Sequence, residues 1–190
     1  MDLGLTGKGA IVTGGSRGIG RAIAHAFADE GANVAICART AEALEATRGE
    51  LAAKGVTVHA ATCDVADGDA LAAFLDSAHD ALGRVDVLVN NAGIRNYVDV
   101  TEASAESWDR MLGVNLKGFA FCAKAAIPAM RRTGGGSIVN IASNSAVIAS
   151  ASAVQYDTTK AAVTGLTRAM ARDHAADGIR VNALYGSGAP

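Results

Sequence analysis

The sequence has no marked excess of positive or negative charge. Its 17 lysine and arginine residues face 19 aspartate and glutamate residues, which gives a formal net charge of -2. No run of basic residues concentrates positive charge in one segment. We therefore expect neither a nucleic acid nor a membrane surface as a partner, and a small molecule fits the composition better.

Residues that bind metals are sparse. The chain has three cysteines and four histidines, all widely spaced, and no CxxC pair. Protein metal sites usually show such residues at short, regular spacing. We therefore expect no metal, and we interpret these side chains as buried or surface residues: Cys37, Cys63, Cys122, His25, His59, His79 and His174.

Long apolar runs are absent as well. No run reaches the length of about 18 residues that indicates a membrane-spanning helix. The first residues lack the charged region and the apolar region of a secretory signal. Because half of the residues are hydrophobic (50%), the chain can bury a large core. We expect one domain over residues 1–190, located in the cytoplasm.

Short apolar segments alternate with longer helical segments along the chain. Strands are expected at 9–14, 33–38, 56–61, 85–91, 136–142 and 179–184, and helices at 19–31, 41–55, 67–83, 106–132 and 152–178. Strands that are apolar on both faces are typical of a parallel sheet covered by helices on either side. The sequence therefore predicts an α/β fold with a doubly wound parallel sheet of about six strands. Gly31, Gly55 and Gly83 are expected to end three helices in the left-handed conformation.

The first expected strand runs into the glycine-rich stretch "TGGSRGIG" at 13–20. In an open parallel sheet, ligands bind beyond the carboxyl ends of the strands. Gly14, Gly18 and Gly20 let the backbone approach a ligand, and the following helix directs free N–H groups at a phosphate. The spacing is not GxGxxG, and a tight connection without a ligand is the alternative.

Arg39 follows the second strand, at the position where NAD-binding domains carry an acidic residue for the ribose hydroxyls. A guanidinium there suits the 2′-phosphate of NADP(H), and Arg17 in the glycine turn adds a second cation. NADP(H) is therefore favoured over NAD(H), which stays possible. The alternative for Arg39 is a solvated loop residue.

Tyr156 and Lys160 lie four residues apart in an expected helix, so they share one face. The functional interpretation is that the ammonium makes the phenol easier to ionise, as a general acid or base requires. The alternative is a helix surface on which the tyrosine packs and the lysine stays in water.

Several stretches together resemble the short-chain dehydrogenase/reductase family over almost the whole chain. They match in order, in spacing and in their position at strand ends. They are "TGGSRGIG" at 13–20, "CDV" at 63–65, "NNAG" at 90–93, Asn115 in "GVNLKG", Ser143 in "NIASNS", and Tyr156 with Lys160. The resemblance implies a Rossmann-type fold with a dinucleotide site and an NADP-dependent oxidoreductase activity.

The resemblance also implies the residues of the site. Its catalytic residues would be Ser143, Tyr156, Lys160 and Asn115. Its cofactor-binding residues would be Gly14, Ser16, Arg17, Gly18, Ile19, Gly20, Arg39, Asp64, Val65, Asn91, Ala92, Gly93, Tyr156 and Lys160. Ser143 is preferred to Ser145 because it lies thirteen residues before Tyr156, the interval usual in the family.

Each catalytic residue has an implied role in moving a hydride between NADP(H) and a carbonyl or secondary alcohol. Tyr156 would act as general acid and base, Ser143 would hold the carbonyl oxygen, and Lys160 would contact the nicotinamide ribose and tune the phenol. Asn115 would hold a water that links Lys160 to solvent, and an exposed helix asparagine is its alternative. The substrate class stays open among 3-oxoacyl thioesters, sugars or polyols, and cyclic ketones.

Two features depart from the family pattern. Asp157 places an anion directly after the tyrosine, and we expect it to face away because neighbouring residues of a helix diverge. The family usually continues after "GIRVNA" with a "PG" pair, a substrate loop and a last strand, whereas this chain reads "LYGSGAP". We therefore expect a C-terminal truncation that leaves the sixth strand as an exposed edge.

Two further functions stay open beside the enzyme. The chain could bind the dinucleotide without turnover, because a substrate lid is missing, or it could serve as a structural subunit. The resemblance implies a homodimer or homotetramer that pairs through the long helices carrying Asn115 and Tyr156.

Overall fold

The computed structural model of the chain describes residues 2–186. Its centre is a parallel sheet of six strands in the order β3-β2-β1-β4-β5-β6. The strands are β1 (Gly9–Thr13), β2 (Asn33–Ala38), β3 (Val58–Thr62), β4 (Val87–Asn90), β5 (Gly136–Ile141) and β6 (Ile179–Leu184). The predicted fold class and the number of strands are confirmed.

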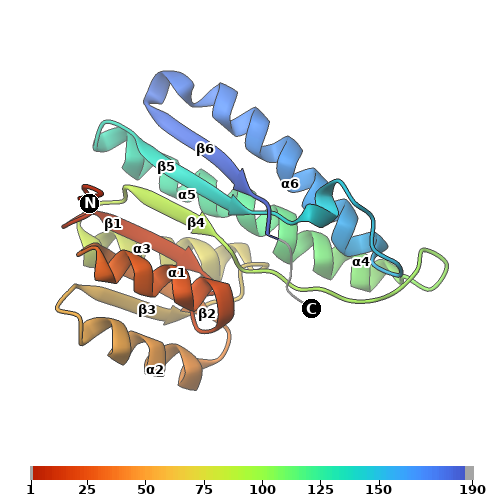
Figure 1. Cartoon of the computed structure of the whole chain (residues 1–190), viewed down its shortest axis with the longest axis horizontal. Helices are drawn as coiled ribbons and strands as arrows, with labels where there is room; N and C mark the ends of the chain where they lie inside the picture. The colour runs from red at the N-terminus through yellow and green to blue at the C-terminus, as the bar shows by residue number, and fades with distance from the viewer. Residues whose placement is uncertain (1, 187–190) are drawn as a thin grey trace.

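Six α-helices connect these strands: α1 (Gly18–Asp29), α2 (Ala41–Ala52), α3 (Gly68–Leu82), α4 (Ala105–Leu112), α5 (Gly118–Arg132) and α6 (Val154–Asp173). In Figure 1, α2 lies near one end of the sheet and α6 near the other. The central strands are buried on both faces, and every residue of β1 is buried. This explains why the strands read as continuous apolar runs.

Each face of the sheet has its own core. On one face, side chains of α1 and α2 such as Ala24 and Leu44 pack with Val12 and Ile36. On the other face, side chains of α3, α5 and α6 pack with the sheet around Leu88 and Ile138. The sheet is therefore doubly wound, as the sequence predicts.

Two expected helices differ from the structure. The helix expected at 106–132 is divided by a π-helical turn at Gly113–Lys117, between α4 and α5. The helix expected at 152–178 is shorter, because α6 ends at Asp173 and a single 3₁₀ turn follows at Ala175–Asp177. Hydrophobic periodicity did not reveal either feature.

The three glycines expected to end helices have left-handed backbone conformations. The φ angles are 76° at Gly31, 83° at Gly55 and 70° at Gly83. Residues with a Cβ rarely adopt such angles, so glycine is favoured where the chain turns back toward the next strand. This prediction is confirmed.

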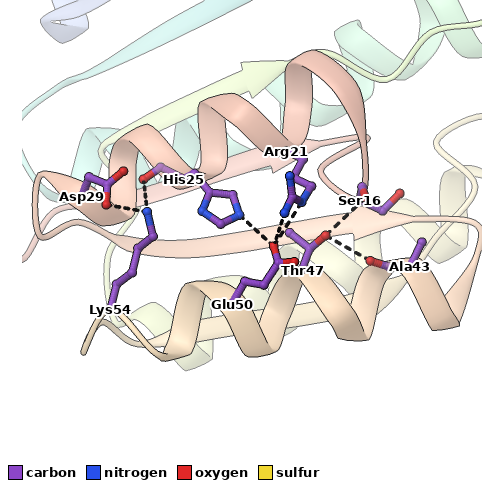
Figure 2. Close-up of polar contacts among 8 residues, drawn as sticks. All are labelled: Ser16, Arg21, His25, Asp29, Ala43, Thr47, Glu50 and Lys54. Carbon is purple, nitrogen blue, oxygen red and sulfur yellow. Dashed lines mark hydrogen bonds and ion pairs between the residues drawn. The ribbon is translucent and has the colours of Figure 1, made fainter.

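Polar contacts fix α2 against α1, as Figure 2 shows. The Glu50 carboxylate accepts hydrogen bonds from Arg21 and His25 of α1, and Lys54 forms an ion pair with Asp29. Thr47 is almost completely buried and donates to the carbonyl oxygen of Ser16 at 3.2 Å. Helix α2 therefore supports the glycine turn that precedes α1.

Candidate active site

A cleft of about 590 Å³ opens at the carboxyl ends of β1 to β4. It lies where ligands bind in open parallel sheets. Twelve residues that the resemblance assigns to the cofactor line it: Gly14, Ser16, Arg17, Gly18, Ile19, Gly20, Arg39, Asp64, Val65, Asn91, Ala92 and Gly93. Tyr156 and Lys160 are not among its lining residues. Their cofactor contacts, and those of the other twelve, stay predictions.

The glycine turn depends on residues that lack a side chain. Gly14 and Gly18 have φ angles of 68° and 55°. A Cβ on Gly20 would lie 2.3 Å from the carbonyl oxygen of Gly14 and 2.4 Å from Nδ2 of Asn91. No side chain caps the first turn of α1, so its N–H groups are free to receive an anion.

Two arginines flank this turn without a partner of their own. Arg17 and Arg39 are exposed and line the cleft. Neither makes a side-chain hydrogen bond or an ion pair with any of residues 2–186, whereas Arg110 in the same cleft binds a carboxylate. Two guanidinium groups without an ion-pair partner in this part of the cleft suit a phosphate group.

Asp64 lies at the adenine end that the resemblance implies, and it is already paired. Its Oδ2 accepts from Arg110 at 2.7 Å and its Oδ1 from the backbone N–H of Ala66 at 3.0 Å. Burial raises the pKa of this carboxyl, but the two hydrogen bonds and the positive charges of Arg110 and Arg39 outweigh burial and hold the pKa below its usual value. Sequence analysis missed Arg110, because 46 residues separate it from Asp64.

Cys37 and Cys63 also line the cleft, although no sequence pattern predicts them there. Both are buried. A hydrogen bond with Cys63, together with burial, raises the pKa of the Cys37 thiol. Such a thiol stays protonated and packs as a small apolar group.

The segment after β4 is tied to the glycine turn. Asn91 donates from Nδ2 to the carbonyl oxygen of Thr13 at 2.9 Å. The backbone N–H groups of Asn91 and Ala92 donate to Oγ1 of Thr13 at 3.0 and 3.1 Å. These contacts join the two halves of the cleft at the point where the strand order reverses.

Asn115 sits in the π-helical turn and is completely buried. Its side chain donates to the carbonyl oxygen of Ile94 and accepts from the N–H of Ile94, both at 2.9 Å. It also donates to Oγ1 of Thr159 on α6 at 3.2 Å. The alternative of an exposed helix asparagine is wrong, because Asn115 holds the segment after β4 against α6. π-Helical turns of this kind are frequent at functional sites.

Lys160 is only 4% exposed. Its Nζ donates to the carbonyl oxygen of Ile141, the last residue of β5, at 2.6 Å and lies 5.6 Å from the centre of the Tyr156 ring. Burial lowers its pKa to about 8. The alternative of a lysine that stays in water is wrong.

Gly93 brings the "NNAG" stretch to this group. A Cβ on Gly93 would lie 3.5 Å from Oδ1 of Asn115 and 3.9 Å from Nζ of Lys160. The structure thus brings together Gly93, Asn115, Lys160 and the half-buried Tyr156. These residues come from three segments that are distant in sequence: the stretch after β4, the π-helical turn and α6.

Ser143 starts the turn after β5, two residues beyond the carbonyl group that binds Lys160. Its hydroxyl accepts from the N–H of Ser145 at 3.1 Å and donates to Asn144 at 3.2 Å. It has no hydrogen bond to Tyr156 among the contacts of residues 2–186. Its role as the residue that holds the carbonyl oxygen stays a prediction.

Asp157 contacts the loop before α6. Its Oδ2 accepts from the N–H of Ser150 at 2.6 Å. That the carboxylate faces away from the phenol stays a prediction. The expected loss of a substrate loop and a last strand concerns the stretch from 187 onward, which lies outside the described residues.

Sequence analysis also missed Arg95. Its guanidinium carbon lies 5.0 Å from the centre of the Tyr156 ring and 4.6 Å from that of Tyr97. A contact between residues that are 61 positions apart leaves no trace in local patterns.

Within residues 2–186, no group of acidic, histidine or cysteine side chains could hold a metal ion, and no helix is long and apolar enough to cross a membrane.

Comparisons with known proteins agree with this geometry. Residues 8–188 match the model of a family described as short chain dehydrogenase. The 3-oxoacyl-(acyl-carrier-protein) reductase FabG of Staphylococcus aureus is 42% identical over 178 residues, which are 93% of this chain and 72% of that protein. A D-threitol dehydrogenase of Mycolicibacterium smegmatis is 38% identical over 184 residues, 97% of this chain and 71% of that protein.

A solved structure is similar as well. The crystal structure of a protein described as a short-chain alcohol dehydrogenase from Sinorhizobium meliloti superposes with a TM-score of 0.93 at 42% identity. The match covers 96% of this chain and 72% of that one.

Proposed function

The chain belongs to the short-chain dehydrogenase family, and from this premise we propose that it is an NADP(H)-dependent oxidoreductase that interconverts a carbonyl group and a secondary alcohol. The observation that carries the proposal is the buried Lys160 beside Tyr156, at the carboxyl edge of the sheet. Burying an ammonium group costs free energy, so its position next to an ionisable phenol favours a catalytic role.

The residues of the cleft fit a dinucleotide. The glycine turn leaves no room for a Cβ at Gly20, and the first turn of α1 has no side-chain cap. These features suit a pyrophosphate group. The free guanidinium groups of Arg17 and Arg39 support NADP(H) over NAD(H), because the 2′-phosphate distinguishes the two molecules.

The nicotinamide of a bound cofactor supplies or accepts the hydride. The phenol of Tyr156 donates a proton to the carbonyl oxygen, on which negative charge develops, and accepts it back in the reverse reaction. The hydroxyl of Ser143 donates a hydrogen bond to the same oxygen. The side chain of Lys160 lies beside the Tyr156 ring, so its ammonium form stabilises the negative charge that appears during proton transfer.

Asn115 holds the segment after β4 in position, and the water that it would hold beside Lys160 stays a prediction. By holding both backbone groups of Ile94, it fixes the segment that carries Gly93 next to Lys160. Such support is required because a misplacement of about 1 Å lowers the rate of a reaction markedly.

The assignment is tested by Tyr156→Phe, which removes the proton donor and keeps the ring. Reduction of 2,3-butanedione, cyclohexanone and ethyl 3-oxobutanoate with NADPH should fall by at least about 100-fold. In calorimetric titration, the variant should bind NADPH about as tightly as the unchanged protein does. Each of the two proteins should bind NADPH more tightly than NADH. Tyr185→Phe is the matched control, because it removes an exposed phenol whose one hydrogen bond within residues 2–186 is with Thr164.

Two results would contradict the proposal. Equal activity of Tyr156→Phe and the unchanged protein would remove the proposed acid. A folded protein that binds NADPH but reduces none of these carbonyl compounds would favour a dinucleotide-binding protein without turnover.

A further inference from the structure

Arg95 lies beside the proposed catalytic tyrosine but outside the nucleotide cleft. Ile94 lines that cleft, whereas Arg95 does not. The guanidinium group lies over two aromatic rings, with its carbon 4.6 Å from the centre of Tyr97 and 5.0 Å from that of Tyr156. Arg95 therefore lies outside the residues that line the nucleotide cleft and within reach of a substrate bound at Tyr156.

The guanidinium group has no anionic partner. Among residues 2–186 no carboxylate lies within ion-pair distance of Arg95, and its N–H groups make no hydrogen bond. By contrast, Arg110 of α4 is paired with Asp64. Arg95 keeps its full set of donors available.

The segment that carries Arg95 is held on both sides. Before it, Asn115 binds both backbone groups of Ile94. After it, Nδ2 of Asn96 donates to Oε1 of the buried Gln155, and Val98 forms a β-bridge with Ala153. The position of Arg95 is thus fixed by α6 and the π-helical turn, which also position the catalytic residues.

Stacking leaves the guanidinium free for a second interaction. A guanidinium contacts aromatic rings through its flat face, while its N–H groups point outward in the plane. That edge matches the two oxygens of a carboxylate and binds them with two parallel hydrogen bonds. An arginine that lies on the catalytic ring and has no acidic partner is therefore a preformed carboxylate receptor.

We propose that Arg95 recognises the carboxylate of the substrate, so that the protein acts on short oxo acids and the corresponding hydroxy acids. The inference rests on the proposed function, because the carbonyl oxygen must bind at Tyr156 for the carboxylate to reach Arg95. Since the guanidinium lies on the ring of the proton donor itself, carboxylate and carbonyl are separated by only a few bonds. A 3-oxo acid has this form, and its reduction consumes one hydride and one proton to give the 3-hydroxy acid.

The test compares an acid with its uncharged ester. We would measure kcat/KM with NADPH for 3-oxobutanoate and methyl 3-oxobutanoate, in the unchanged protein and in Arg95→Gln. The variant should lose about 10- to 100-fold with the acid, the value of a charge-assisted pair of hydrogen bonds, and little with the ester. Arg95→Lys should recover only part of the loss, because an ammonium cannot bind both oxygens in one plane.

Arg180→Gln is the matched control. Arg180 is an exposed arginine at the start of β6, at the edge of the sheet opposite the site. The variant removes the same charge as Arg95→Gln but far from the site. It should therefore leave the ratio of kcat/KM for the acid to kcat/KM for the ester unchanged. A ratio that moves equally in both variants would overturn the inference, because only the overall charge would then matter.

Two further results would overturn it. An equal loss with acid and ester in Arg95→Gln would make Arg95 a support for Tyr156, and no loss with either would make the stacking a packing contact. If the proposed function fails and the unchanged protein reduces neither compound, calorimetric titration with 3-hydroxybutanoate decides. Binding that disappears in Arg95→Gln supports the receptor, whereas absent or unchanged binding removes it.

Discussion

The two ends of the site are held in place in opposite ways. At the proposed nucleotide end, the glycine turn at 14–20 depends on missing side chains, and Arg17 and Arg39 are exposed. At the proposed catalytic end, Asn115 and Lys160 are buried and hold backbone groups of distant segments. One end therefore depends on backbone shape and the other on buried side chains.

This difference predicts how each end responds to a substitution. An added atom should damage the nucleotide end, because the backbone of the turn approaches other residues closely. A removed polar atom should damage the catalytic end, because a buried partner is left without a hydrogen bond. A variant that responds in the opposite way would contradict this comparison.

The largest effect is expected for Gly20→Ala. The new Cβ would lie 2.3 Å from the carbonyl oxygen of Gly14, and such a clash forces the turn to move. Overpacking of this kind lowers the free energy of unfolding by about 1–3 kcal/mol, and we expect NADPH binding to fall by more than about 100-fold because the phosphate-binding N–H groups shift. Urea unfolding and calorimetric titration measure the two effects.

Gly49→Ala is the matched control for this variant. Gly49 lies on the exposed side of α2, where a Cβ meets nothing within 4 Å. Alanine there should raise the free energy of unfolding by about 0.5–1 kcal/mol. If Gly20→Ala bound NADPH as well as Gly49→Ala, the turn would not be the phosphate site.

The next effect concerns Lys160 and depends on pH. Burial lowers its pKa from 10.5 to about 8. Between these two values the unfolded chain binds more protons than the folded one, so the contribution of Lys160 to the free energy of unfolding rises with pH. The rise should reach about 3 kcal/mol between pH 7 and pH 11, and Lys160→Met should lack it.

Urea unfolding at several pH values checks this prediction through the difference between the unchanged protein and the variant. Lys124→Met is the control, since Lys124 is exposed on α5. Its difference from the unchanged protein should not vary with pH. If the difference in the free energy of unfolding between Lys160→Met and the unchanged protein were also independent of pH, the predicted effect of burial on Lys160 would be wrong.

The same contrast explains what the sequence could predict. Strands β1, β2, β5 and β6 were placed within a residue of their ends, because they read as short apolar runs bounded by glycine or polar residues. The glycine turn was found for a similar reason, since its conformation depends on local residues alone. The fold and the nucleotide end can therefore be predicted from local patterns in the sequence.

The catalytic end could not be derived in this way. The π-helical turn at Gly113–Lys117 was missed because it depends on Asn115 binding Ile94, 21 residues earlier. The stacking of Arg95 on Tyr156 likewise joins distant segments. The role of Ser143 came from the resemblance to a family, which also decided between the two interpretations that the spacing of Tyr156 and Lys160 left open.

The smallest change is expected for Arg39→Asp, which keeps the protein folded and alters only the charge at the rim of the nucleotide end. Arg39 is exposed and unpaired within residues 2–186, so its loss leaves no buried partner. An aspartate there repels a 2′-phosphate and can accept hydrogen bonds from the ribose hydroxyls. Calorimetric titration should show the ratio of NADPH to NADH affinity falling by about 10- to 100-fold. Because Arg17 remains, NADPH should still bind.

Arg168→Asp makes the same charge change on the exposed side of α6, and it should leave the ratio of NADPH to NADH affinity unchanged. An unaltered ratio in Arg39→Asp would mean that the nucleotide end selects its ligand by the shape of the turn alone, and the assignment of the 2′-phosphate to Arg39 would be lost.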